Sequence, residues 1–190
     1  MLRSSGRNCM MSPRMNLSHL KVLIDEGQLR QRTRELGNQI TQDYEGRQLH
    51  LICILKGACV FLADLMRYLS LDTSVDFMAL SSYSNSLHTS GEVKIIKDLD
   101  CSIQGRDVLL VEDILDTGLT LDYLLRTLQA RRPGSLRTVT LLSKPARRIK
   151  FVEVAYIGFE IPNDFVVGYG LDHGEKYRNL PNICILKTDE

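Results

Sequence analysis

The chain has 190 residues, of which 44% are hydrophobic and 25% are charged, and its formal net charge is +1. These values exclude a disordered or fibrous protein, and the small net charge argues against a protein built mainly to bind nucleic acid or an anionic membrane. The length suits one domain with a substantial core, and no apolar run reaches the roughly 20 residues that a membrane helix needs.

Residues 1–17 differ in composition from the rest of the chain. They contain three arginines and several serines, and no acidic residue occurs before Asp25. We expect a disordered extension, or a true start at Met11 or Met15, ahead of a single domain that spans residues 18–190. A transit peptide is the remaining alternative, although the segment lacks a clear amphipathic period.

The cysteines show no CxxC spacing and mostly lie in apolar surroundings. They are Cys9, Cys53, Cys59, Cys101 and Cys184. We expect buried free thiols in a reducing compartment, rather than a metal site or a disulfide framework. With no apolar core of a secretory signal in the sequence, this pattern indicates a cytoplasmic protein.

Strand and helix patterns alternate along the middle of the chain. Apolar residues at helical spacing predict helices over residues 24–44, 59–69 and 119–130. Short apolar or alternating runs predict strands at residues 49–57, 75–83, 93–99, 107–113, 136–144, 153–161, 165–170 and 182–187. This order predicts an α/β fold with a mostly parallel central sheet and helices on both faces.

The segment VLLVEDILDTGLTL, residues 108–121, places several polar side chains after its most apolar strand. Ligands of a parallel sheet bind beyond the carboxyl ends of the strands, where we expect Glu112 and Asp113. A small-residue loop before a helix offers backbone N–H groups, the positive end of the helix dipole and the Thr117 and Thr120 hydroxyls, which together suit a phosphate. The two carboxylates suit sugar hydroxyls and a divalent cation.

This segment resembles the phosphoribosyl-diphosphate motif of type I phosphoribosyltransferases. Lys56-Gly57, Ser82-Tyr83, the strand-terminal Lys144 and residues 165–181 follow in the order found in one branch of that family. From about residue 20 to the C-terminus, the chain is similar to hypoxanthine(-guanine) phosphoribosyltransferases of the short bacterial kind. The resemblance implies the type I phosphoribosyltransferase fold, with a small hood formed by the N- and C-terminal segments.

The resemblance also implies an activity, a cofactor and partners. The expected enzyme acts in purine salvage and transfers the phosphoribosyl group of 5-phosphoribosyl 1-diphosphate to hypoxanthine and/or guanine. The products would be IMP or GMP and diphosphate, and the cofactor would be Mg²⁺. A homodimer or homotetramer is expected, with neither a nucleic acid nor a membrane as a partner.

Roles for the residues of the quoted segment follow from the same resemblance. Asp116 would be the acid/base group that faces nitrogen seven of the purine, and Glu112 and Asp113 would bind the ribose hydroxyls and the metal. The loop for the 5′-phosphate would consist of Asp116, Thr117, Gly118, Leu119 and Thr120. Some relatives carry Lys or Arg at position 119, so phosphate binding here must depend on backbone N–H groups and hydroxyls.

The other motifs supply the remaining substrate contacts. Lys56, Gly57 and Arg178 match the diphosphate-binding positions. The purine-binding positions are Lys144, Phe165, Val166 and Asp172, and Asp172 also matches a metal ligand. An ammonium can only donate hydrogen bonds, so the Lys144 position favours a 6-oxo group over a 6-amino group.

Ser82 and Tyr83 match the start of a mobile lid, and the polar residues 84–92 fit that mobility. Such a lid would exclude water from an oxocarbenium-like transition state.

Three alternatives stay open at this point. The enzyme could act on another base, such as xanthine, and the preference between hypoxanthine and guanine is undecided. A phosphoribosyltransferase-like regulator that binds nucleotide and RNA would be expected to show a basic face, which the net charge of +1 does not indicate. A simple nucleotide-binding module would not need both Asp116 and a lid.

Overall fold

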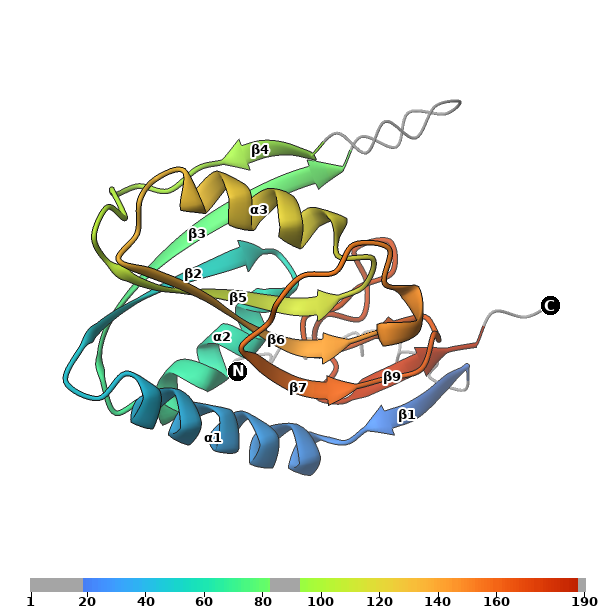
Figure 1. The fold of residues 1–190 in the computed structure, drawn as a ribbon. Helices are drawn as coiled ribbons and strands as arrows, with labels where there is room; N and C mark the ends of the chain where they lie inside the picture. Colours follow the sequence, from blue (N-terminus) through green and yellow to red (C-terminus); the bar gives the residue numbers. More distant parts are fainter. Residues whose placement is uncertain (1–18, 83–92, 188–190) are drawn as a thin grey trace, which may run out of the picture.

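The computed structural model describes residues 19–82 and 93–187, which form two sheets and the helices around them (Figure 1). The expectations for residues 1–17 and for Tyr83 and the loop after it lie outside the described residues. No helix within the described ranges is long and apolar enough to cross a membrane.

The larger sheet has six strands and is parallel except at one edge, as the sequence predicted. In order across the sheet the strands are β4 (Val93–Lys97), β3 (Asp72–Ser82), β2 (Gln48–Leu55), β5 (Asp107–Leu115), β6 (Ser135–Ser143) and β7 (Tyr156–Glu160). Only the β3–β4 pair is antiparallel. The carboxyl ends of β2, β5 and β6 therefore meet at one edge of the sheet.

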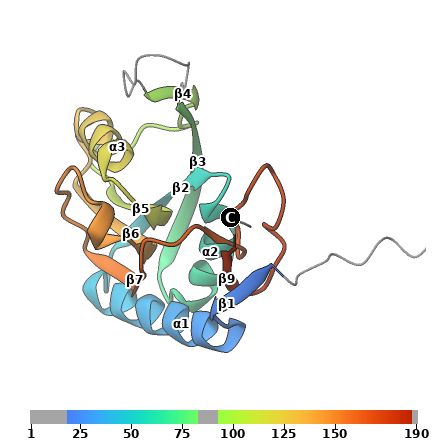
Figure 2. The same cartoon turned by 90° about the vertical axis from the view of Figure 1, so that its right-hand side faces the viewer.

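Helices cover both faces of this sheet (Figures 1 and 2). The helices are α1 (Glu26–Asp43), α2 (Ala58–Leu65) with its 3₁₀ extension η1 (Met66–Tyr68), α3 (Leu119–Gln129) and the short 3₁₀ turn η2 (Pro145–Arg147). α1 and α2 lie on one face and α3 lies on the other. Because β2 and β5 are buried on both faces, they read as continuous apolar runs.

Successive side chains of the central strands enter two separate cores. Leu51 and Leu109 belong to the core under α1 and α2, which also contains Phe61. Their neighbours Ile52 and Leu110 belong to the core under α3. The period-two alternation of a strand thus joins both helical layers to one rigid sheet.

The smaller sheet joins the two ends of the described chain, and it confirms the expected hood. Its antiparallel strands are β1 (Leu20–Ile24), β9 (Ile183–Leu186) and β8 (Val166–Val167). The sequence did not predict β1, because five residues carry little periodic signal and their pairing partner lies at the other end of the chain. Asp25 caps α1 through its side chain, so the helix begins at Glu26 rather than at residue 24.

Several other boundaries differ from the prediction, and two of them lie at the candidate site or in the hood. β5 continues through Leu115, because its pairing with β6 extends to Ser143. The strand predicted at residues 165–170 shrinks to β8, since positive φ angles at Gly168, Tyr169 and Gly170 end it.

The expectation of buried thiols holds only in part. Cys53, Cys59, Cys101 and Cys184 are free, as expected. Cys53 and Cys184 are buried, but Cys59 on α2 and Cys101 in the loop after β4 are exposed. The burial prediction was wrong for these two, because apolar neighbours in the sequence do not show which side of a helix or loop faces solvent.

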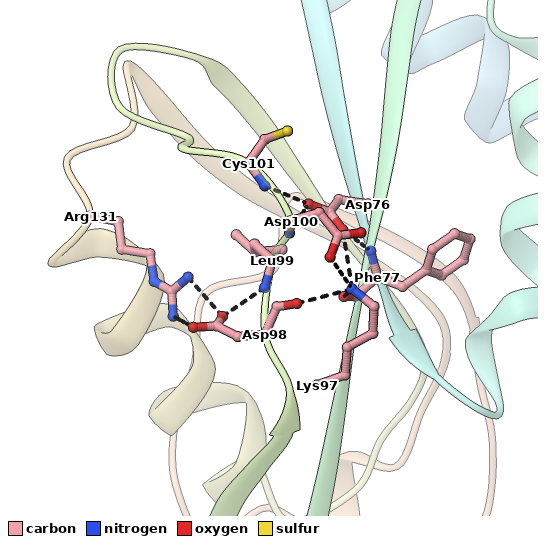
Figure 3. A network of polar contacts seen from close by, with 8 residues as sticks. All are labelled: Asp76, Phe77, Lys97, Asp98, Leu99, Asp100, Cys101 and Arg131. Atoms are coloured by element: carbon pink, nitrogen blue, oxygen red, sulfur yellow. Dashed lines mark hydrogen bonds and ion pairs between the residues drawn. The ribbon is translucent and has the colours of Figure 1, made fainter.

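A buried carboxylate on β3 fastens the loop that leads into β5 (Figure 3). Asp76 is 4% exposed, and its two oxygens accept backbone N–H groups of Phe77 at 2.7 Å and Asp100 at 2.8 Å. The Lys97 ammonium lies 3.6 Å from the same carboxylate. Burial alone would raise the pKa of Asp76, but the backbone hydrogen bonds and Lys97 outweigh it, and the pKa is lowered.

We predict that Asp76→Ala lowers the free energy of unfolding by about 1–3 kcal/mol, because it leaves partly buried N–H groups without their acceptor. Asp100→Ala is the matched control, since its side chain is 78% exposed, and it should cost less than about 0.5 kcal/mol. Urea unfolding measures both values.

The cost of Asp76→Ala should depend on pH. A lowered pKa in the folded state gives stability that is present above the usual value of 3.8 and is lost as the pH falls through the folded value. The difference between wild type and Asp76→Ala should therefore narrow below about pH 4. A difference that stayed constant down to pH 2 would contradict this account.

Candidate active site

Two adjacent carboxylates at the end of β5 form the centre of the candidate site. Glu112 is only 8% exposed, and Asp113 is half-buried. A pocket of about 320 Å³ opens over them. It is lined by Ile54, Leu55, Leu80, Glu112, Asp113, Ile114, Leu115, Asp116, Thr117, Gly118, Thr120 and Leu121. The structure thus brings together the acidic pair and the loop that the sequence singled out.

The folded protein disfavours the charged form of both carboxylates. Burial raises the pKa of Glu112 well above its usual value, and the charge of Asp113 raises it further. Burial also raises the pKa of Asp113 to about 6, against the opposing effects of the Ile114 N–H and the Arg178 guanidinium. A cation or hydroxyl donors placed over the pair would therefore bind where negative charge is poorly compensated.

Of the expected phosphate loop, residues 116–118 connect β5 to α3, whereas Leu119 and Thr120 form the first residues of the helix. Gly118 has φ +85°, a left-handed conformation that disfavours other residues, and it precedes the first residue of the helix. The N-cap residue Gly118 has no side chain to cap the helix, and the first N–H, that of Leu119, makes only a long 3.4 Å hydrogen bond to the Thr117 hydroxyl. The first N–H groups of α3 and the Thr117 and Thr120 hydroxyls, both at the pocket, are therefore suited to an anion.

The segment after β6 makes backbone hydrogen bonds to this loop. The N–H groups of Ile149 and Lys150 both donate to the carbonyl of Thr117 at 3.0 Å. A Cβ on Gly118 would lie 2.3 Å from the Lys150 carbonyl oxygen. Glycine at position 118 is thus required both by its backbone angle and by the close approach of this segment.

Asp116 and Lys144 lie at the ends of the neighbouring strands β5 and β6. The Lys144 N–H donates to the Leu115 carbonyl at 2.9 Å, and its side chain is only 7% exposed. Burial lowers the pKa of Lys144, whereas the negative charge of Asp116 acts in the opposite direction. An ion pair joins Asp116 to Arg147, with Arg147 Nε 2.7 Å from Asp116 Oδ1. No pattern in the sequence marks Arg147, so its contact with Asp116 was not predicted.

The cationic groups expected at a diphosphate lie close together on the hood side of the pair. Lys56 Nζ is 2.9 Å from Glu175 Oε2, and Arg178 Nη2 is 3.4 Å from Glu175 Oε1. Arg178 also contacts Asp172 Oδ1 at 2.8 Å. Glu175 thus connects the two cations, a contact that the sequence did not predict. The Lys56 ammonium lowers the pKa of Glu175.

The Lys-Gly turn fits tightly against the acidic pair. A Cβ on Gly57 would lie 1.6 Å from Asp113 Oδ2, and a Cβ on Gly170 would lie 2.1 Å from the Gly57 carbonyl oxygen. The backbone of the turn can reach both the carboxylate and the hood only because these two residues have no side chain. Lys56-Gly57 therefore lies beside the acidic pair.

Two of the expected purine-binding residues, Phe165 and Val166, lie at the start of β8 in the hood. Phe165 is 51% exposed, which is unusual for a large apolar side chain, and its ring lies edge-on to His173 at 5.4 Å between centroids. Val166 is buried in β8, where it pairs with Ile185. An exposed ring held by a neighbouring ring is free to stack on a flat ligand.

Asp172 does not form a three-carboxylate metal site together with Glu112 and Asp113. Its oxygens contact Arg178 and the N–H of Glu175, the latter at 2.9 Å. Within residues 19–82 and 93–187, no group of three acidic, histidine or cysteine side chains could hold a metal ion. Ser82 ends β3 at the same edge of the sheet as the pair.

Known proteins resemble this chain over most of its length. The family model of the phosphoribosyl transferase domain matches residues 22–173. The hypoxanthine-guanine phosphoribosyltransferase of Bacillus subtilis (strain 168) is 50% identical over 167 residues, which cover 88% of this chain and 93% of that protein. A crystal structure of a hypoxanthine phosphoribosyltransferase from Staphylococcus aureus has a TM-score of 0.85 and 49% identity, covering 89% of this chain and 92% of that chain.

Some relatives are much longer. The bifunctional protein TilS/HprT of Listeria innocua is 52% identical over 169 residues, which cover 89% of this chain but 26% of that protein. The chain therefore spans about a quarter of the length of the bifunctional relatives that it matches.

We predict that Gly118→Ala destabilises the protein more than Gly46→Ala does. Both glycines have a positive φ, but a Cβ at Gly46 meets nothing within 4 Å, whereas one at Gly118 meets the Lys150 carbonyl. The overpacked position should cost about 1–3 kcal/mol more than the control. Thermal unfolding of the two variants measures this difference, and equal losses would show that position 118 is not confined as the structure indicates.

Proposed function

Since the chain belongs to the phosphoribosyl transferase family, we propose that it transfers the phosphoribosyl group of 5-phosphoribosyl 1-diphosphate to hypoxanthine and/or guanine in purine salvage. One observation carries the proposal: a single edge of the sheet holds a buried carboxylate pair, a phosphate loop, Asp116 and Lys144. The names of relatives about 50% identical over most of both chains support the choice of base. The products would be diphosphate with IMP or GMP.

The sugar and the cation would bind at the acidic pair. Glu112 and Asp113 would accept hydrogen bonds from the ribose hydroxyls, and the loop from Asp116 to Thr120 would hold the 5′-phosphate. The pair also suits Mg²⁺, which usually takes one or two protein carboxylates together with substrate phosphates. When bound, Mg²⁺ would neutralise charge on the diphosphate and on the pair. Asp172 could join only by leaving Arg178 or the Glu175 N–H.

Departure of the diphosphate would be helped by the two cations on the hood side. As the bond from the anomeric carbon to the diphosphate breaks, negative charge grows on the leaving oxygens and positive charge grows on the ribose. Lys56 and Arg178 can stabilise the leaving group once it replaces Glu175 as their partner. A lid beginning at Ser82 and Tyr83 would exclude water, which would otherwise consume the cationic sugar.

The base would bind between the ends of β5, β6 and the hood. Lys144 would donate to the 6-oxo group, Phe165 would stack on the purine, and the Val166 carbonyl would meet the substituent at position two. As nitrogen nine bonds to the anomeric carbon, Asp116 would accept the proton from nitrogen seven. The family resemblance further supports a homodimer or homotetramer in the cytoplasm.

We predict that Asp116→Asn lowers kcat by about 100-fold or more, because the amide keeps the shape but cannot accept the proton. The affinity for phosphoribosyl diphosphate should change little. Asp122→Asn is the matched control, since Asp122 also pairs with an arginine but lies on α3 outside the pocket. Steady-state kinetics with hypoxanthine measures both variants, and near-normal turnover of Asp116→Asn would remove Asp116 from the acid/base role.

The proposed base preference is tested with hypoxanthine, guanine, xanthine and adenine, each with phosphoribosyl diphosphate and Mg²⁺. Because Lys144 can only donate, kcat/KM for adenine should be lower than for hypoxanthine by as much as about 10⁴-fold. Lys144→Gln adds an acceptor, so it should lower activity on 6-oxopurines and narrow that ratio. Use of adenine as readily as hypoxanthine by the wild type would refute the proposed function.

A further inference from the structure

Backbone hydrogen bonds hold the segments that carry the ion pair between Arg147 and Asp116. Arg147 belongs to η2, and its N–H donates to the Lys144 carbonyl at 3.1 Å. Lys144 is fastened in turn to Leu115, and Ile149 is fastened to Thr117. Backbone hydrogen bonds thus connect the segment before Arg147 to Leu115 and the segment after it to Thr117, the two neighbours of Asp116. The contact is therefore more than a chance meeting of two surface side chains.

The contact engages only one side of the carboxylate. Arg147 Nε lies 2.7 Å from Oδ1, and this oxygen is buried, but the N–H is not aligned with it as a hydrogen bond. In the described part of the chain, no hydrogen bond or ion pair engages Oδ2 of Asp116. The interaction is thus a close charge contact that fixes one oxygen and leaves the other for a ligand in the pocket.

A second arginine, Arg148, lies beside the same loop. Arg148 Nη2 donates to the Ser143 hydroxyl at 3.0 Å, and its Cδ lies 3.2 Å from the position of a Cβ on Gly118. Burial lowers the pKa of Arg148, and the negative charge of Asp116 acts against this. Arg148 therefore packs against the loop at Gly118, whereas Arg147 contacts the Asp116 carboxylate directly.

We propose that Arg147 is a positioning residue for the acid/base group: it holds Oδ1 of Asp116 so that Oδ2 accepts the proton from nitrogen seven of the purine. The inference rests on the proposed function. In the step, nitrogen nine gives its electron pair to the anomeric carbon, and the bond to the diphosphate breaks with its electrons going to the diphosphate. The proton on nitrogen seven passes to Asp116 Oδ2.

A positioning role and a structural role lead to different kinetics. Arg147 is 45% exposed at its side chain, and exposed ion pairs contribute little to stability. Loss of a support for the phosphate loop would raise the KM for phosphoribosyl diphosphate. Loss of a constraint on Asp116 would lower kcat and leave that KM unchanged, and it would have no effect once Asp116 itself was replaced.

The test is a double-mutant cycle on the full chain, assayed with hypoxanthine, phosphoribosyl diphosphate and Mg²⁺. Arg147→Gln should lower kcat by about 10-fold and leave the KM for phosphoribosyl diphosphate within about twofold of wild type. Arg147→Lys should recover part of the loss, because it restores the charge. The matched control is Arg126→Gln, since Arg126 pairs with Asp122 away from the pocket, and it should have no effect. In the Asp116→Asn background, Arg147→Gln should cause no further loss.

Each contrary outcome has a definite meaning. Normal kcat in Arg147→Gln, or a loss that is repeated in full in the Asp116→Asn background, would overturn the inference while the wild type remains active. A raised KM with unchanged kcat would also overturn it, since it would assign Arg147 to the phosphate loop. Arg147→Met serves as a second uncharged variant if Arg147→Gln does not fold, with the same results expected. A wild type inactive on every purine base would instead refute the proposed function.

Discussion

The burial of two adjacent carboxylates at the end of β5 is the constraint on which the site depends. A parallel strand covered by helices on both faces leaves its last residues in a poorly solvated place, and there Glu112 and Asp113 have raised pKa values. The ligand-free protein loses stability through this arrangement. Sugar hydroxyls and a divalent cation would offset the loss, so the same feature that weakens the fold would provide affinity for the substrate.

The cationic side chains expected at the substrate already have protein partners. Lys56 is paired with Glu175, and Arg178 is paired with both Asp172 and Glu175. These pairs are exposed or half-exposed, and such contacts are weak and readily exchanged. The site therefore neutralises its own charges in the absence of ligand, and an entering diphosphate would replace carboxylates that hold the cations near their working positions.

Local patterns predicted much of the fold and of the site. The apolar run of β5, the small-residue loop and the helical period of α3 are contiguous in the sequence, so the pocket around Glu112, Asp113 and Thr117 could be predicted from them. Glu175 could not, because its contact with Lys56 joins residues 119 positions apart. β1 was not predicted for the same reason, since its pairing partner β9 lies at the other end of the chain. Arg147 is placed by a turn after β6 that no periodicity marks.

The most direct test is thermal unfolding of the wild type and of Asp113→Asn, each with and without Mg²⁺ and phosphoribosyl diphosphate. Without ligand, Asp113→Asn should have the higher Tm, because a neutral isostere removes a buried charge whose pKa is raised. With ligand at about 100 times its Kd, the wild type should gain about 2.7 kcal/mol, and the variant should gain far less. An equal gain in both proteins, or a lower Tm of the ligand-free variant, would contradict the account of the buried pair.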